Sequence, residues 1–122
     1  MDNTQLDELI DHCLTHPLSD ALLYPLLGEL GRAAFCDAFS RRVAHRYAGS
    51  QLSFEAADAA MNHLFAFACS GQDDVFSGYA WSVFRAFDEG EYSHAGDPDE
   101  TDPEAKYTRA QIMAIVARDL VQ

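Results

Sequence analysis

The stretch FEAADAAMNHLFAFACSG, residues 54–71, contains the clearest helical pattern in the chain. Its apolar residues recur at the three- and four-residue spacing that brings side chains onto one face of an α-helix. They are Phe54, Ala57, Met61, Leu64, Phe65 and Ala68. Ser70 and Gly71 then provide a stop, since glycine is the usual residue just after a helix end. The stretch therefore predicts a helix with one continuous apolar face.

Similar patterns lie on both sides of this stretch. In chain order, helices are predicted from Thr4 to Thr15, from Ser19, from Arg32 to Tyr47, from Val75 to Asp88 and from about Thr108 to Leu120. Thr4 and Ser19 are the expected caps, and Pro17, Gly49 and Gly90 the expected stops. No segment alternates polar and apolar residues as a strand would, and no hairpin turn is present. The sequence predicts an all-α fold, a single compact domain over residues 1–122 with five or six helices.

Length and composition agree with a globular chain. At 122 residues and 48% hydrophobic, it is long and apolar enough for a core of its own. Its apolar runs are too short to span a bilayer, and its start lacks the basic and apolar parts of a signal peptide. Three widely spaced cysteines, Cys13, Cys36 and Cys69, fit buried thiols better than disulfides. These features predict a cytoplasmic protein with no membrane partner.

The charge balance narrows the range of partners. The formal net charge is −12, from 20 acidic and 8 basic residues. Nucleic acids and anionic lipids need a positive surface, so this balance argues against both and favours a basic protein partner. One cluster is basic and lies on one flank of a predicted helix: Arg41, Arg42, His45 and Arg46. We expect these side chains to pair with the chain's own acids.

An acidic connection precedes the last predicted helix. Eight acids lie between residues 88 and 104 with no lysine or arginine among them: Asp88, Glu89, Glu91, Asp97, Asp99, Glu100, Asp102 and Glu104. Tyr92, His94 and Tyr107 are interspersed with this charge. The connection covers about 19 residues, and unstructured connections of that length are uncommon unless they are functional or disordered.

Known metal-binding and catalytic motifs match this connection poorly. Glu91 and His94 have the spacing of a di-iron ligand pair, but such a site needs a second pair and two more glutamates. Asp97 opens an EF-hand-like run, yet Asp102 stands where the loop requires glycine. Glu91 and Asp97 supply two carboxyls for acid–base work, without a sign of contrasting environments. The sequence therefore predicts no catalytic residue, metal site or cofactor. The alternative is a small metal-binding or carboxylate-dependent enzyme that uses Glu91, His94 and neighbouring acids.

The same residues suit a protein interface. Acidic charge speeds encounter with a basic partner, and aromatic side chains slow the dissociation of the complex. The predicted contact residues are therefore the eight acids together with Tyr92, His94 and Tyr107. Trp81 is a possible further contact, although core packing is the better expectation for a large aromatic residue. An acidic helical adaptor for a different basic protein fits these features too, and the sequence leaves self-association open.

Residues 86–109, AFDEGEYSHAGDPDETDPEAKYTR, also resemble a segment of small acidic helical immunity-type proteins that are encoded beside bacterial polymorphic toxins. The similarity rests on DEGEY, H-x-G-D and KYT, at positions Glu91, Tyr92, His94, Gly96, Asp97, Lys106, Tyr107 and Thr108. The resemblance implies a non-enzymatic cytoplasmic protein that binds and neutralises its own toxin domain. It assigns no individual role to any of these positions.

Overall fold

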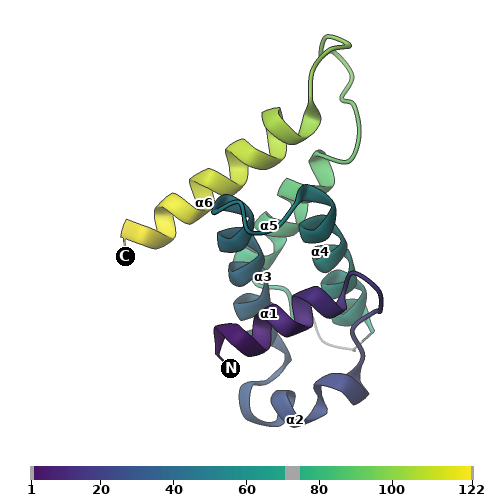
Figure 1. The fold of residues 1–122 in the computed structure, drawn as a ribbon, viewed down its shortest axis with the longest axis vertical. Helices are drawn as coiled ribbons and strands as arrows, with labels where there is room; N and C mark the ends of the chain where they lie inside the picture. Colours follow the sequence, from purple (N-terminus) through teal and green to yellow (C-terminus); the bar gives the residue numbers. More distant parts are fainter. Residues whose placement is uncertain (1, 71–74, 122) are drawn as a thin grey trace.

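Three central helices form the middle of the molecule in the computed structural model (Figure 1). They are α3 (Arg32–Ala48), α4 (Phe54–Cys69) and α5 (Gly78–Glu89), and each packs against the other two. The structure describes residues 2–70 and 75–121, without the side chains of residues 25, 26, 28 and 29. Every regular element within these residues is helical, which confirms the predicted all-α fold.

Caps define where these helices begin. The side chains of Ser53 and Ser77 each accept a hydrogen bond at 3.1 Å from a backbone N–H in the first turn of α4 and α5. Ser19 caps α2 (Asp20–Leu30) in the same way, as predicted. For α1 (Asn3–His12) the predicted cap, Thr4, is wrong. Asp2 caps this helix, because its side chain and that of Gln5 satisfy each other's backbone N–H groups.

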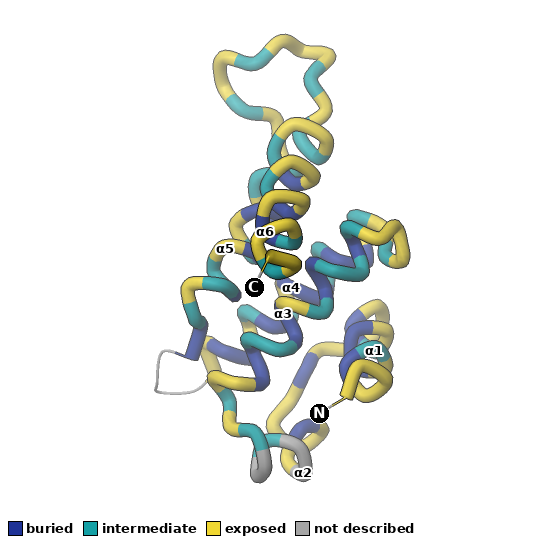
Figure 2. The backbone as a smooth tube through the Cα atoms, turned by 90° about the vertical axis from the view of Figure 1, so that its left-hand side faces the viewer, coloured by how far each residue is buried: buried dark blue, intermediate teal, exposed yellow. Residues whose placement is uncertain are grey.

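The core lies where the predicted apolar faces meet. Phe35, Phe39 and Phe87 are its largest fully buried side chains, and Phe35 contacts Phe39 and Phe67 at ring-centroid distances of 5.6 and 5.8 Å. Full burial of such a side chain contributes roughly 1.5–3 kcal/mol relative to exposure. Figure 2 shows this buried interior running along α3, α4 and α5. The helices are thus held together mainly by buried apolar side chains, and the spacing of these residues in the sequence is what predicted the helices.

Two of the three cysteines belong to this interior. Cys13 and Cys36 are buried free thiols, and burial raises their pKa to about 12 and about 11. Cys69 is free but exposed, so the prediction that it is buried is wrong. It is the last residue of α4, and its side chain lies outside the face that α3 and α5 cover.

The last helix begins earlier than its sequence pattern predicts. A π-helical segment, η1 (Glu104–Arg109), precedes α6 (Ala110–Val121), so Glu104 and Tyr107 lie on a helix and not in a loop. The non-helical connection is therefore shorter than predicted. It forms a projection at one end of the molecule, while the far end of α6 extends away from the body (Figure 1). Residues 88–107 are called the acidic arm below.

Candidate partner-binding surface

The base of the acidic arm is fixed by a close contact between α5 and η1. The buried Thr108 hydroxyl donates to the Ala86 carbonyl oxygen at 2.6 Å. Gly90, the C-cap of α5, lies so near that a Cβ at this position would be 2.1 Å from the Thr108 hydroxyl oxygen. Gly90 was predicted only as a helix stop. Its missing side chain also lets the chain leave α5 directly beneath η1.

Three aromatic rings stack along the arm. The ring centroids of Tyr92 and His94 are 4.4 Å apart, and those of His94 and Tyr107 are 3.9 Å apart. The His94 Nε2 lies 2.7 Å from the Glu89 carbonyl oxygen, and since a carbonyl only accepts, this nitrogen donates. Tyr92 at the outer end of the stack is 50% exposed. The rings predicted as contact residues therefore form one assembly that ties the arm to α5.

Asp97 closes the arm on its other side. Its carboxylate accepts hydrogen bonds from the Tyr107 hydroxyl, at 2.5 Å, and from the Lys106 ammonium group. These two bonds, from Lys106 first and then Tyr107, hold the pKa of Asp97 below its usual value. Gly96, with φ of +93°, provides the left-handed backbone that turns the chain into this contact. Asp97 and Lys106 therefore have a positioning role in the arm.

Glu104 anchors the arm to the body. Its carboxylate accepts from the Tyr47 hydroxyl on α3 at 2.6 Å and from Arg109 at 3.3 Å. The spacing of Glu104 and Arg109 is five residues, which a π-helical turn aligns. Asp102 accepts from the backbone N–H of Glu104 at 3.0 Å and begins the helical segment. Glu104, predicted as a contact residue, is thus occupied within the fold.

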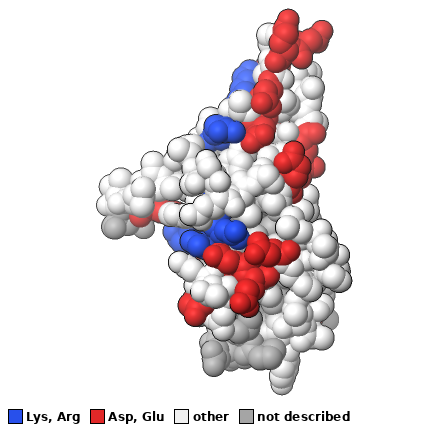
Figure 3. All heavy atoms as spheres, viewed as in Figure 1, with Lys and Arg blue, Asp and Glu red and all other residues white. Residues whose placement is uncertain are grey.

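The remaining predicted acids divide into two groups. Asp88, Asp99, Glu100 and Asp102 are exposed and form no ion pair within the described residues. Glu89 accepts from the Gln111 side chain at 2.7 Å, and Glu91 contacts Asp58 on α4. Acidic side chains lie along the arm on the face shown in Figure 3. Lys106 is the one lysine or arginine in the sequence of the arm. The acidic arm therefore keeps an outward surface of unpaired carboxylates.

The contact between Asp58 and Glu91 was not predicted. Burial raises the pKa of Asp58 to about 8, and a hydrogen bond with Glu91 and the charges of Asp88 and Glu55 add to the rise. A carboxyl–carboxyl hydrogen bond requires one shared proton. The contrast in environment that acid–base catalysis needs, and that the sequence does not indicate for Glu91 and Asp97, thus exists at Asp58. No periodicity signals this pairing, because it depends on how α4 meets the start of the arm.

Trp81 lies in a different part of the molecule. It is partly buried two helical turns before Asp88, with ring centroids 5.3 Å from Phe76 and 5.6 Å from Phe65. The Arg85 guanidinium lies 5.5 Å from the Trp81 ring centroid. This agrees with the expectation of core packing, and the structure does not bring Trp81 together with the stacked rings of the arm.

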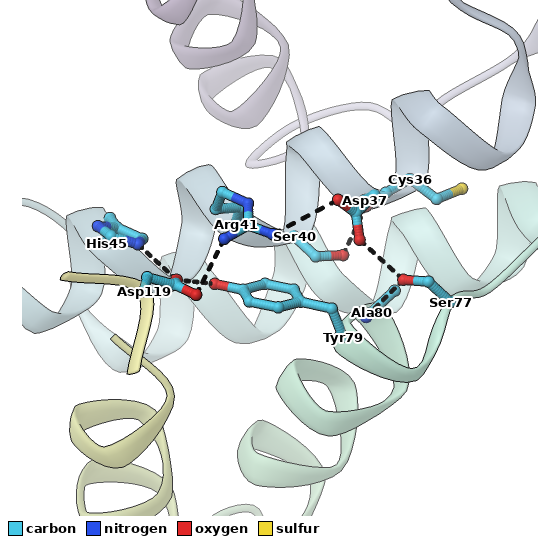
Figure 4. A network of polar contacts seen from close by, with 9 residues as sticks. All are labelled: Cys36, Asp37, Ser40, Arg41, His45, Ser77, Tyr79, Ala80 and Asp119. Carbon is cyan, nitrogen blue, oxygen red and sulfur yellow. Dashed lines mark hydrogen bonds and ion pairs between the residues drawn. The ribbon is translucent and has the colours of Figure 1, made fainter. Parts of the chain in front are cut away.

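The basic flank of α3 pairs with the chain's own acids, as predicted. Asp119 of α6 accepts from the Tyr79 hydroxyl at 2.6 Å and lies 2.7 Å from His45 and 2.9 Å from Arg41 (Figure 4). Within α3, Arg41 also pairs with Asp37. The remaining ion pairs of this flank join Arg42 to Asp7, and Arg46 to Asp7 and Asp11. These contacts attach α1 and α6 to α3.

The described residues contain neither a cluster of metal ligands nor a membrane-spanning helix. No cluster of three or more histidine, cysteine, aspartate or glutamate side chains is arranged to hold a metal ion in residues 2–70 and 75–121. Within the same residues, none of the helices has the length and apolar character needed to cross a bilayer. In comparisons with known proteins, no family model, no curated protein and no solved structure matches the chain.

Proposed function

We propose that this chain is a cytoplasmic immunity or inhibitor protein that binds a cognate toxin domain, or another basic protein, through its acidic arm. The observation that carries the proposal is that the acids of the arm have two different roles, one structural and one at the surface. Asp97 and Glu104 hold the arm in shape, while Asp88, Asp99, Glu100 and Asp102 remain exposed without ion pairs in the described structure.

The shape of the arm supports this proposal because it lowers the cost of binding. Ordering a flexible loop on association costs conformational entropy, which reduces affinity. Here the ring stack and the Asp97 contacts already order the arm without a partner. Tyr92 presents an exposed ring on this ordered support, the type of residue that dominates binding energy in protein interfaces.

The charge supports it for a separate reason. A net charge of −12 attracts a basic surface from a distance, and a projecting group of carboxylates focuses that attraction at the arm. Electrostatic steering of this kind can make association roughly 100-fold faster than it is between uncharged partners. Toxin domains that act on nucleic acids need basic clefts, and an acidic arm fits such a cleft.

The test is co-expression with the product of the adjacent gene. We expect the two proteins to co-purify, and cells that express the neighbour to grow only when this chain is present. Absence of a complex together with absence of protection would contradict the immunity proposal. A complex without protection would support the wider class of basic-protein adaptors instead.

A pair of tyrosine variants locates the contact. Tyr92→Ala removes the exposed ring of the arm, and Tyr24→Ala removes a 78% exposed ring on α2 as a matched control. We expect Tyr92→Ala to weaken the complex at least 30-fold, the loss of about 2 kcal/mol typical of an anchor residue. The Tyr24 variant should bind as the original chain does, and the reverse order would place the interface away from the arm.

One observation favours a second candidate, a small carboxylate-dependent enzyme. A carboxyl with a raised pKa, such as that of Asp58 beside Glu91, is common at catalytic sites. Elemental analysis of the purified protein, with Glu91→Ala and His94→Ala as controls, separates the metal-dependent form of this candidate from the first proposal. Stoichiometric metal that both variants lose would favour the enzyme.

A further inference from the structure

The outer face of α6 is apolar and uncovered. Exposed apolar residues follow one another at helical spacing along its whole length: Ala110, Met113, Ala114, Ala117, Leu120 and Val121. Met113, Leu120 and Val121 are 50%, 76% and 86% exposed, and they are three of the seven exposed large hydrophobic residues in the described chain. The inner face is also apolar, with Ile112 and Ile115 in the core. A helix that is apolar on both faces normally has a neighbour on each.

The C-terminal part of α6 also carries little acidic charge on the face shown in Figure 3. The one acid of α6, Asp119, is turned inward and is engaged by Tyr79, His45 and Arg41. Most of the surface over the C-terminal part of α6 is uncharged in Figure 3. Two copies that each carry a charge of −12 repel one another least when they meet at such a face.

The positions on α6 are self-complementary for an antiparallel pair. Ala110, Ala114, Ala117 and Val121 have the alternating four- and three-residue spacing of a coiled-coil seam and fall within an arc of about 60°. A two-fold axis between Ala114 and Ala117 places Ala114 opposite Ala117 of the second copy, and Ala110 opposite its Val121. The small residues therefore meet at the centre, and a small residue faces a larger one at each end.

Charge complementarity favours a second copy over other occupants. Within the described part, six of the eight basic residues form ion pairs with the chain's own acids, and Arg85 and Arg118 do not. Arg118 and Gln111 lie on the same flank of the seam and line one groove with Glu89. In the antiparallel pair the same flanks of the two helices meet. Each Arg118 then reaches Gln111 of the other copy and the Glu89 carboxylate that this glutamine binds at 2.7 Å.

We propose that the chain forms a two-fold symmetric dimer through antiparallel contact of the outer faces of α6, with Arg118 of each copy paired to Glu89 of the other. The inference is independent of the proposed function. The contact involves one helix of about 18 Å from each copy, which is small for a protein interface, so the dimer is weak and reversible. The two acidic arms lie at opposite ends of the dimer.

The test is the mass of the protein in solution as a function of its concentration, with a reductant because Cys69 is exposed. By analytical ultracentrifugation, we expect the mass to rise from 13.5 kDa toward twice that value between about 1 and several hundred micromolar. Ala117→Glu places a charge at the centre of the seam and should abolish the rise. Ala66→Glu adds the same charge at an exposed alanine of α4 and should leave it unchanged.

A charge exchange tests the orientation. Arg118→Glu and Glu89→Arg should each weaken the dimer about 10-fold, and the double variant should restore it. A mass that stays at 13.5 kDa at every concentration would overturn the proposal. A dimer that survives Ala117→Glu, or single charge variants that the double variant fails to rescue, would overturn it as well.

Discussion

The body and the acidic arm are built on different principles. In the body, α3, α4 and α5 join through fully buried side chains such as Phe39 and Phe87. In the arm, order comes from ring stacking and polar bonds at the surface, with Tyr92 exposed and Asp97 bound to Tyr107 and Lys106. Apolar burial makes the body stable as a unit. We therefore expect the arm to have its own local stability, which polar substitutions change without unfolding the rest.

The largest expected effect comes from a substitution in the body. Phe39→Ala removes a fully buried ring that contacts Phe35, and we expect unfolding to become easier by about 3–5 kcal/mol. Urea denaturation followed by circular dichroism measures this. Tyr92→Ala in the arm should leave the unfolding midpoint unchanged, and an equal loss in both variants would contradict the separation of arm from body.

Gly90→Ala tests the joint between the two regions. The new Cβ would lie 2.1 Å from the Thr108 hydroxyl oxygen and 3.0 Å from the Phe54 ring, so we expect a loss of about 1–3 kcal/mol in unfolding free energy. Gly78→Ala, in the first turn of α5, meets no atom within 4 Å. It should be neutral or stabilise the helix by up to about 1 kcal/mol. Equal stability of both variants would show that Gly90 serves only as a helix stop.

The next largest expected effect is on the pH dependence of stability, and it comes from Asp58. In the unfolded chain its pKa takes the ordinary value of about 3.9, whereas burial and Glu91 raise the pKa in the folded protein to about 8. The folded state therefore binds this proton more tightly, and stability falls as pH rises from about 4 to about 8. Solvent screening reduces the full shift, so we expect Asp58→Asn to stabilise the protein by about 1–2 kcal/mol at pH 8.

The control for Asp58 is Asp99→Asn, at an exposed position of the arm. Urea unfolding at pH 5 and pH 8 should show a smaller difference between the two pH values for Asp58→Asn than for the original chain. The Asp99 variant should keep the original difference. An unaltered pH dependence in Asp58→Asn would show that the carboxyl pair does not share a proton.

The smallest expected effect is confined to the arm. Asp97→Asn weakens the contacts with Lys106 and Tyr107, so the backbone amides of the arm should exchange with solvent faster, with no change in global unfolding. Hydrogen exchange followed by mass spectrometry measures this. Asp99→Asn should leave exchange unaltered. Faster exchange throughout the body of Asp97→Asn would show that the arm and the core unfold together.

Helical periodicity predicted the body because burial and spacing are linked. The apolar face of residues 54–71 became α4, and the i, i+4 ladder from Arg32 became α3, ended by Gly49 as predicted. Ser70 and Gly71 are predicted to end α4, and Gly71 lies outside the described residues. The start of the last helix was missed because Glu104 and Lys106 directly follow a run of acids and prolines, although glutamate and lysine are good helix formers. Their tertiary partners Tyr47 and Asp97 hold them in η1.

The arm shows why the rest could not be predicted. Tyr92, His94 and Tyr107 could be identified as unusual aromatics in an acidic segment, but no sequence spacing predicts that they stack. Asp58 gave no signal at all, since its pKa depends on contact with Glu91, 33 residues later in the chain. Contacts of this kind depend on tertiary packing and not on local propensity.

Association kinetics with the product of the adjacent gene test the central claim, that the acidic arm docks a basic partner. Asp99→Lys reverses an unpaired charge on the arm, and Glu8→Lys makes the same change at an exposed position of α1. By stopped-flow fluorescence at low salt, we expect Asp99→Lys to reduce the association rate several-fold more than Glu8→Lys does, and this difference to vanish at high salt. Equal rates for the two variants at low salt would contradict it.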